Sequence, residues 1–123
     1  SHTRVTDTGV KELIKLTKLT SVGLWGTQVS DIGVIELTKL RNLKGLALGG
    51  TRVTDSGIKS LVSLKQLTSL GLHGTAITDE SIKNLAQLKN LKSVNLTNSK
   101  VTSKGIAILR QELPNCQISG AID

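Results

Sequence analysis

Four carboxylates recur at a constant interval of 24 residues along this chain: Asp7, Asp31, Asp55 and Asp79. In a stacked repeat they would lie about one strand spacing (~5 Å) apart, and such a ladder of carboxylate oxygens could bind cations. Each residue also falls at an expected helix start, where the helix dipole and free N–H groups favour negative charge. We therefore predict that these carboxylates cap helices.

The other residues that could take part in catalysis or in binding a metal or a phosphate lack the partners that such sites require. Cys116 has no neighbouring His–Asp arrangement and falls in an expected final strand, so we interpret it as a buried, unreactive thiol. Gly49-Gly50 lacks the remaining glycines and the Lys-Ser/Thr of a phosphate-binding loop. Nothing places His2 beside His73, which leaves no cluster of zinc ligands. The sequence predicts no catalytic residue, no metal and no cofactor, so we expect that the chain is not an enzyme.

The pattern L-x-x-[L/V]-x-L-x-x-[T/S]-x-[V/I] organises the chain. It occurs at residues 43–53 and returns every 24 residues, at 19–29, 67–77 and 91–101. A fixed period of this length is typical of stacked repeats. We predict one domain over residues 1–123, composed of repeats 5–28, 29–52, 53–76 and 77–100, with 101–123 as an atypical C-terminal capping repeat. Residues 1–4 would be the tail of a truncated preceding repeat or the remnant of a tag.

Each repeat is expected to contain one short helix. In the first repeat, Val10, Leu13 and Ile14 have the i, i+3, i+4 spacing of one helix face. Thr6 or Asp7 would supply the N-cap, because a side-chain oxygen there accepts an unpaired backbone N–H. The same start recurs at Ser30, Thr54, Thr78 and Thr102.

Each repeat is also expected to contain one strand, since apolar residues alternate at positions such as Val22 and Leu24. One helix and one strand per period force successive strands to run parallel. Stacking then gives a right-handed α/β solenoid, with strands on its concave face and helices on its convex face. A turn with positive φ is expected after each strand, at Gly26, Gly50, Gly74 and Asn98. Hydroxyls beside this turn should bond to backbone groups, from Thr27, Thr51, Thr75 and Ser99.

The composition suits stacked aliphatic layers, because Trp25 is the only aromatic residue. The 16 Lys and Arg against 9 Asp and Glu give a net charge of +7, which fits either an acidic partner or a solvated basic surface. A single cysteine excludes an internal disulfide, and no apolar run is long enough to span a membrane. These features slightly favour the cytoplasm and leave the compartment unknown.

With these residues laid out, the chain resembles the leucine-rich repeat family. The family pattern L-x-x-L-x-L-x-x-[N/C]-x-L is matched four times, with Thr or Ser in place of Asn or Cys. The Val-Thr-Asp-x-Gly helix start at residues 5–9 and 53–57 is similar to the cysteine-containing subclass, found in F-box substrate receptors and many bacterial proteins. The ending at residues 113–118 is similar to bacterial members of the planctomycete type. The resemblance implies a solenoid that binds proteins through its concave strand face, and without an F-box segment a ubiquitin-ligase adaptor role has no support.

The concave face should be formed by the strand residues that alternate with the core positions. Most of these outward side chains are small, which allows close approach of a partner's backbone. The candidate partner-binding residues are Trp25, His73, Asn95, Thr97, Ser21, Ser69 and Ser93.

Trp25 has the features of an interface anchor, since exposed Trp is enriched among binding hot spots. In a purely structural role it would cover the N-terminal edge or pack on a repeat that precedes this chain. His73, roughly 10 Å from Trp25, would form one polar site with Asn95 and Thr97, or would simply be a solvated residue.

We predict a non-catalytic protein–protein interaction module whose partner the sequence does not identify. One alternative is a structural fragment whose N-terminal edge, with no visible cap, docks a domain or forms a weak homo-oligomer instead of a monomer. A weaker alternative is electrostatic binding of nucleic acid or an anionic surface through convex lysines, namely Lys11, Lys15, Lys39, Lys59 and Lys83. The lack of aromatic residues to stack bases argues against nucleic acid.

Overall fold

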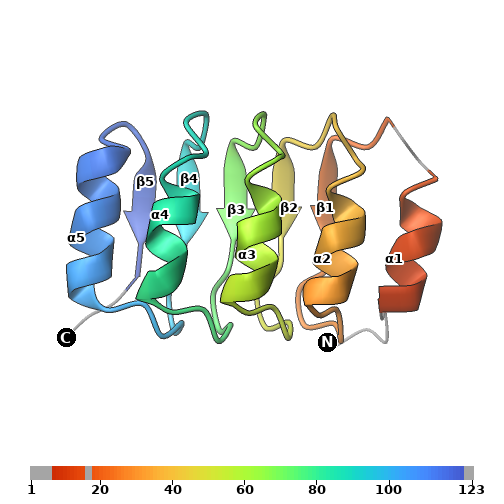
Figure 1. Ribbon diagram of the computed structural model, residues 1–123, viewed down its shortest axis with the longest axis horizontal. Coiled ribbons are helices and arrows are strands. Elements are labelled where there is room, and N and C mark those ends of the chain that lie inside the picture. Colours follow the sequence, from red (N-terminus) through yellow and green to blue (C-terminus); the bar gives the residue numbers. More distant parts are fainter. Residues whose placement is uncertain (1–6, 16–17, 121–123) are drawn as a thin grey trace.

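Helices and strands alternate along the chain and form two layers, as seen in Figure 1, in a computed structural model that describes residues 7–15 and 18–120. The helices are α1 (Asp7–Leu13), α2 (Asp31–Leu37), α3 (Asp55–Leu61), α4 (Ile82–Leu85) and α5 (Ser103–Glu112), and a 3₁₀ turn η1 (Asp79–Ser81) directly precedes α4. The strands are β1 (Ser21–Gly23), β2 (Gly45–Ala47), β3 (Ser69–Gly71), β4 (Ser93–Asn95) and β5 (Gln117–Ser119). The expectations for residues 1–4 and for a Thr6 cap lie outside the described residues.

The strands form one parallel 5-stranded sheet in the order β1-β2-β3-β4-β5. Their register follows the sequence period: Ser21 pairs with Gly45, which pairs with Ser69, and the same step leads to Ser93 and Gln117. All helices lie on one side of this sheet (Figure 1). The predicted α/β solenoid, with parallel strands on one face and short helices on the other, is confirmed.

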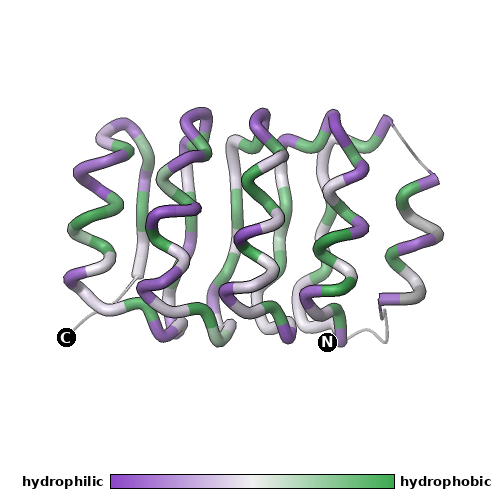
Figure 2. The backbone as a smooth tube through the Cα atoms, viewed as in Figure 1, coloured by the Kyte–Doolittle hydropathy of each residue, from purple (hydrophilic) through white to green (hydrophobic). Residues whose placement is uncertain are grey.

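A continuous aliphatic core fills the space between the two layers. The middle residue of every strand is buried, in a row formed by Val22, Leu46, Leu70, Val94 and Ile118. Apolar residues recur at matched positions of successive repeats, as the green segments of Figure 2 show. Because each repeat contributes only a thin apolar layer, its burial depends on the neighbouring repeats.

The turns and helix starts follow the sequence predictions. Gly26, Gly50, Gly74 and Asn98 have φ between 59° and 69°. Beside them, the Thr51 hydroxyl donates to the Leu48 carbonyl at 2.7 Å, and the hydroxyls of Thr75 and Ser99 repeat this bond in their own repeats. The predicted N-caps are confirmed for the four helices that begin after Ser30, Thr54, Thr78 and Thr102.

The last repeat differs from the others, as its sequence indicates. The α5 helix is 10 residues long, and Leu113 is buried at its end while Glu112 is exposed. The Arg110 guanidinium donates to the Ile118 carbonyl at 3.1 Å, on the end strand of the sheet.

Two lysines expected on the convex helices lie elsewhere. Because α1 ends at Leu13 and α2 ends at Leu37, Lys15 and Lys39 belong to the connectors that lead from helix to strand. A helix of two turns ends before it reaches these two positions, which the sequence spacing had placed on the helices. Lys11, Lys59 and Lys83 do lie on helices.

Candidate binding surface

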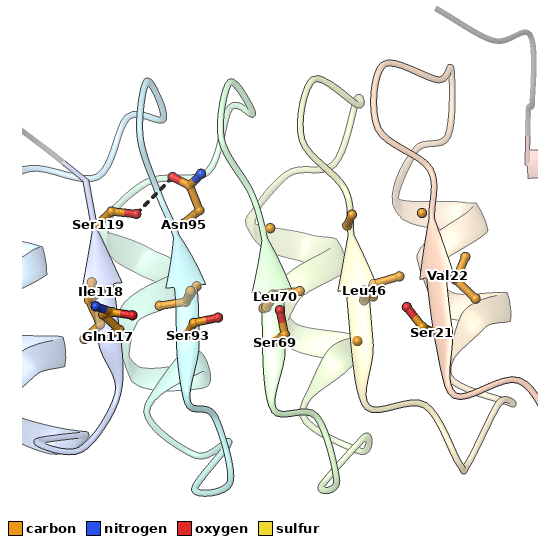
Figure 3. A pocket seen from close by; sticks show the side chains of 15 residues that line it. Ser21, Val22, Leu46, Ser69, Leu70, Ser93, Asn95, Gln117, Ile118 and Ser119 are labelled. Carbon is orange, nitrogen blue, oxygen red and sulfur yellow. Dashed lines mark hydrogen bonds between the residues drawn. The ribbon is translucent and has the colours of Figure 1, made fainter.

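The sheet face opposite the helices is hollowed across all five strands. The hollow has a volume of about 640 Å³ and is lined by residues 21–23, 45–47, 69–71, 93–95 and 117–119. No Asp, Glu, Lys, Arg or His lies among these lining residues. Figure 3 shows serines on four of the strands, at Ser21, Ser69, Ser93 and Ser119. A ligand in this hollow would contact hydroxyl and backbone groups and no charged side chain.

The alternation of strand residues places the predicted serines on this face. Ser21 and Ser69 are exposed, Ser93 is half-buried, and all three line the hollow. Gly23, Gly45 and Gly71 interrupt the side chains between them, so a partner's backbone can approach closely. The sequence argument from strand alternation therefore locates the floor of the surface.

Trp25 and His73 stand on the strand-to-helix side of the hollow, two residues beyond Gly23 and Gly71. Trp25 is 48% exposed although it is the only aromatic residue of the chain. The His73 ring lies over Gly49: a Cβ built at Gly49 would come within 2.0 Å of the imidazole Cε1 atom. The glycine is thus required for the ring's position, and His73 reaches from its own repeat toward the preceding one.

The Nδ1 atom of His73 is buried and has no hydrogen-bond partner among the residues that the structure describes. Asn95 instead contacts the following repeat, since its Oδ1 atom accepts from the Ser119 hydroxyl at 3.2 Å (Figure 3). The same atom also accepts from the Thr97 N–H at 3.0 Å. Thr97 is exposed. Asn95 lines the hollow, whereas Trp25, His73 and Thr97 are not among its lining residues. His73 and Asn95 contact opposite neighbours.

The recurring carboxylates bond from one repeat to the next. Asp7 accepts from the Ser30 N–H at 2.8 Å, the Ser30 hydroxyl at 2.5 Å and the Gly33 N–H at 2.9 Å. Asp31 accepts from both the N–H and the hydroxyl of Thr54, and Asp79 does the same with Thr102. Asp7 therefore bonds to an N–H of the following helix, and Asp31 and Asp79 bond to the residue that caps it, whereas the sequence argument had each carboxylate cap its own helix. Each of the three does lie in the first turn of its own helix, as predicted, but its oxygens accept from donors of the next repeat.

Asp55 has the fullest set of donors. It accepts from the Thr78 N–H at 2.8 Å, the Thr78 hydroxyl at 2.6 Å and the Ser81 hydroxyl at 2.5 Å. Burial alone would raise the pKa of this carboxyl, but the bonds from Ser81 and Thr78 outweigh it and hold the pKa below its ordinary value.

The third residue of the helices is small because the preceding carboxylate occupies its space. A Cβ at Gly33, Gly57 or Gly105 would lie 2.4 Å from the nearest oxygen of Asp7, Asp31 or Asp79. In the fourth repeat Ser81 takes this place, and there the helix begins as η1 before it continues as α4. Sequence reasoning missed this contact; the signal was the Gly of the Thr-Asp-x-Gly motif, together with its replacement by Ser81.

Cys116 is only partly buried, whereas we expected a fully buried thiol. It lies just before β5, at the margin of the core. Burial raises the pKa of the thiol and so favours its protonated form. The thiol donates a long hydrogen bond to the Gln117 carbonyl at 3.8 Å.

Within residues 7–15 and 18–120, no three His, Cys, Asp or Glu side chains come together as a metal site. In the same part of the chain, no helix has the length and apolar character needed to cross a bilayer.

These features define a solenoid repeat protein with an open, hollowed strand face. A leucine-rich repeat family model matches residues 39–62. The fold is similar to a leucine-rich repeat protein of Leptospira interrogans, at 27% identity and a TM-score of 0.71 over 96% of this chain and 29% of the other. Residues 39–62 therefore match the leucine-rich repeat family, and the chain has the fold of leucine-rich repeat structures.

Two further structures share the fold. Internalin C2 of Listeria monocytogenes matches at 24% identity and a TM-score of 0.69, over 92% of this chain and 49% of its own. Actin-binding site 2 of leiomodin-1 matches at 21% identity and a TM-score of 0.74, over 93% of this chain and 78% of its own. The present chain thus spans less than half the length of either bacterial structure. No curated protein matches the sequence.

Proposed function

We propose that this protein is a non-catalytic interaction module that binds a protein partner on its hollowed strand face. The observation that supports this most directly is the uncharged hollow across five strands, with the half-exposed Trp25 at its side. Small residues on the floor allow close approach, and an exposed Trp supplies a large apolar anchor for a partner. Trp25, His73, Asn95, Thr97, Ser21, Ser69 and Ser93 would form the contact surface.

The similar structures support an interaction role in general. The leiomodin-1 segment is named for binding actin, and its fold is similar to that of this chain. The bacterial neighbours are in keeping with a bacterial origin and with the bacterial subclass that the closing residues 113–118 resemble.

Affinity capture from a lysate of the source cell tests the proposed face. Wild-type protein is compared with Trp25→Ala/His73→Ala, and circular dichroism verifies that both are folded. The matched control is Ile32→Ala/Ile35→Ala, which removes two side chains that are 64% and 49% exposed on the opposite face. We expect a protein that is captured by the wild type and the control and lost from the strand-face variant. Capture by all three would reject this face.

The structural alternative rests on the position of β1 at one end of the sheet. An end strand presents backbone N–H and C=O groups that can pair with a second copy or another domain. Light scattering across a concentration series distinguishes this alternative from a monomeric binding module: a mass that rises with concentration and is unaffected by Trp25→Ala supports it.

A further inference from the structure

The basic residues are not evenly spread over the molecule. The connectors that lead from helix to strand, residues 14–20, 38–44, 62–68 and 86–92, contain half of the 16 Lys and Arg and none of the Asp and Glu. We call this set the basic edge: Lys15, Lys18, Lys39, Arg41, Lys44, Lys65, Lys89 and Lys92. Every one of them is exposed. The opposite edge, at the strand-to-helix turns, mixes Arg52 and Lys100 with the carboxylates in the first turns of the helices.

All the connectors of the basic edge lie along one side of the solenoid. Each strand follows its connector directly, and the parallel order of the strands keeps the connectors adjacent. They form the upper margin of the view in Figure 2, where hydrophilic residues recur. Arg41, Lys65 and Lys89 share one slot of three successive repeats, so their backbones are about 5 Å apart near the sheet.

The backbone of this edge is held by bonds between repeats. The Lys44 N–H donates to the Thr20 carbonyl at 2.7 Å, and the Thr68 N–H donates to the Lys44 carbonyl at 2.8 Å. Lys92 continues the series, and the Asn90 amide donates to the Lys65 carbonyl at 2.8 Å. A rigid base for the lysines reduces the ordering cost of binding.

The connectors of this edge contain no carboxylate of their own. Lys39 pairs with Glu36 at 3.3 Å, on the helix side of the edge. Like charges this close repel one another, and a partner that supplies carboxylates would relieve that repulsion.

The basic edge is continuous with the hollow of the strand face. Lys44 and Lys92 directly precede Gly45 and Ser93, which line that hollow. A ligand lying in the hollow therefore has two cations within reach at its margin. The hollow itself is uncharged and offers hydroxyl groups, which suits a polypeptide backbone.

We propose that the basic edge and the adjoining hollow together bind an acidic polypeptide segment. Its backbone lies across the strand face, and its carboxylates contact Lys44, Lys92 and the row formed by Arg41, Lys65 and Lys89. Five strands cover about 19 Å, the length of about six residues of extended chain. Nucleic acid fits less well, because the edge has no aromatic side chain to stack a base. A planar membrane would contact the edge but could not enter the hollow.

This inference rests on the proposed function and specifies the chemistry of the partner. The test uses a labelled peptide of alternating Glu and Ser, with a Gln-Ser peptide of the same length as the neutral control. Duplex DNA and phosphatidylserine vesicles are the competing anions. Binding is measured by fluorescence anisotropy or co-sedimentation at low and at physiological salt.

The edge variant is Arg41→Glu/Lys65→Glu/Lys89→Glu. The matched control is Lys59→Glu/Lys83→Glu/Lys104→Glu, which changes the net charge equally on exposed convex positions. We expect the edge variant to bind the acidic peptide about tenfold more weakly or worse, and the control to lose less than about threefold. Lys44→Gln/Lys92→Gln should also weaken binding, because it removes the cations at the margin of the hollow.

Equal losses of affinity for the acidic peptide in the edge variant and the control would overturn the proposal, because the change in net charge alone would then explain them. Equal binding of the Gln-Ser peptide would also overturn it, as would tighter binding of DNA or vesicles that the edge variant abolishes. Capture of the cellular partner separates this inference from the proposed function. If Trp25→Ala/His73→Ala loses the partner but the edge variant retains it, the proposed binding by the strand face is supported. The proposal that the partner supplies an acidic segment is then rejected.

Discussion

Gly57 lies where the carboxylate of Asp31 approaches α3 from the preceding repeat. A Cβ on Gly57 would be 2.4 Å from the Asp31 Oδ1 atom and 3.2 Å from the Asp31 Cγ atom, so the carboxylate would have to leave the position in which it bonds to Thr54. In an ordinary helix, replacing Gly by Ala stabilises the protein by up to about 1 kcal/mol. At Gly57 the clash should reverse that sign.

We therefore predict that Gly57→Ala lowers the free energy of unfolding by about 1–3 kcal/mol. Ser56→Ala, at the exposed neighbouring position of α3, is the control and should change it by less than about 0.5 kcal/mol. Urea denaturation measures both. A stabilised Gly57→Ala protein would show that the carboxylate does not require the space.

Asp55 makes stability depend on pH in a defined direction. Its three donors hold the folded-state pKa below the ordinary value of 3.8. The stabilisation is therefore complete above pH 3.8, declines as the pH falls below it, and is lost once the pH has fallen through the lowered pKa.

We predict that Asp55→Asn is less stable than the wild type at neutral pH, because an amide N–H₂ would face the donors of Thr78 and Ser81. The difference between the two proteins should shrink as the pH is lowered through the acid range below 3.8. Unfolding by urea at a series of pH values checks this. A difference that is constant with pH would exclude the ionised carboxylate as its source.

At the scale of the element, each helix has only 4 to 10 residues. Isolated helices of that length are not stable in water, so caps and packing decide whether they form. Thr54 serves α3 twice: its hydroxyl accepts from the Ser56 N–H at 3.3 Å and donates to Asp31 of the preceding repeat.

We predict that Thr54→Ala destabilises the protein by about 1–2 kcal/mol, because it removes the cap and leaves Asp31 with one donor fewer. Thr54→Ser retains the hydroxyl and should recover most of that loss. Thermal unfolding followed by circular dichroism compares the variants. Equal losses of stability in Thr54→Ala and Thr54→Ser would assign the effect to the methyl group of Thr54 instead.

The sequence predicts the elements well because their causes are local. Apolar spacing, N-cap residues and the turn glycines act within one repeat, and they correctly indicate the strand register and the positive φ of Asn98. The contacts of Asp31 and His73 could not be predicted in this way, since spacing gives a residue's place in its repeat but not the neighbour toward which its side chain leans. The basic edge was missed for a related reason: Lys15 and Lys39 belong to it because α1 ends at Leu13 and α2 ends at Leu37, and helix ends are weakly encoded.

At the scale of the whole molecule, the described sheet begins with β1 and ends with β5. The Gln117 N–H donates to the Lys92 carbonyl, and the Ser119 carbonyl accepts from the Leu96 N–H, on either side of β4. The backbone groups of Ile118 therefore face away from β4. Arg110 covers one of them by donating to the Ile118 carbonyl at 3.1 Å. A charged group over an end strand is a common means of preventing pairing between sheets.

We predict that Arg110→Ala increases self-association of the protein, because it uncovers a carbonyl on the end strand and removes a positive charge beside it. Arg52→Ala removes the same charge from an exposed turn and is the matched control. Light scattering over a concentration series should give a larger mass for Arg110→Ala and an unchanged mass for Arg52→Ala. If both variants associate equally, lost charge repulsion explains the effect; if neither does, Arg110 does not protect the Ile118 carbonyl from pairing.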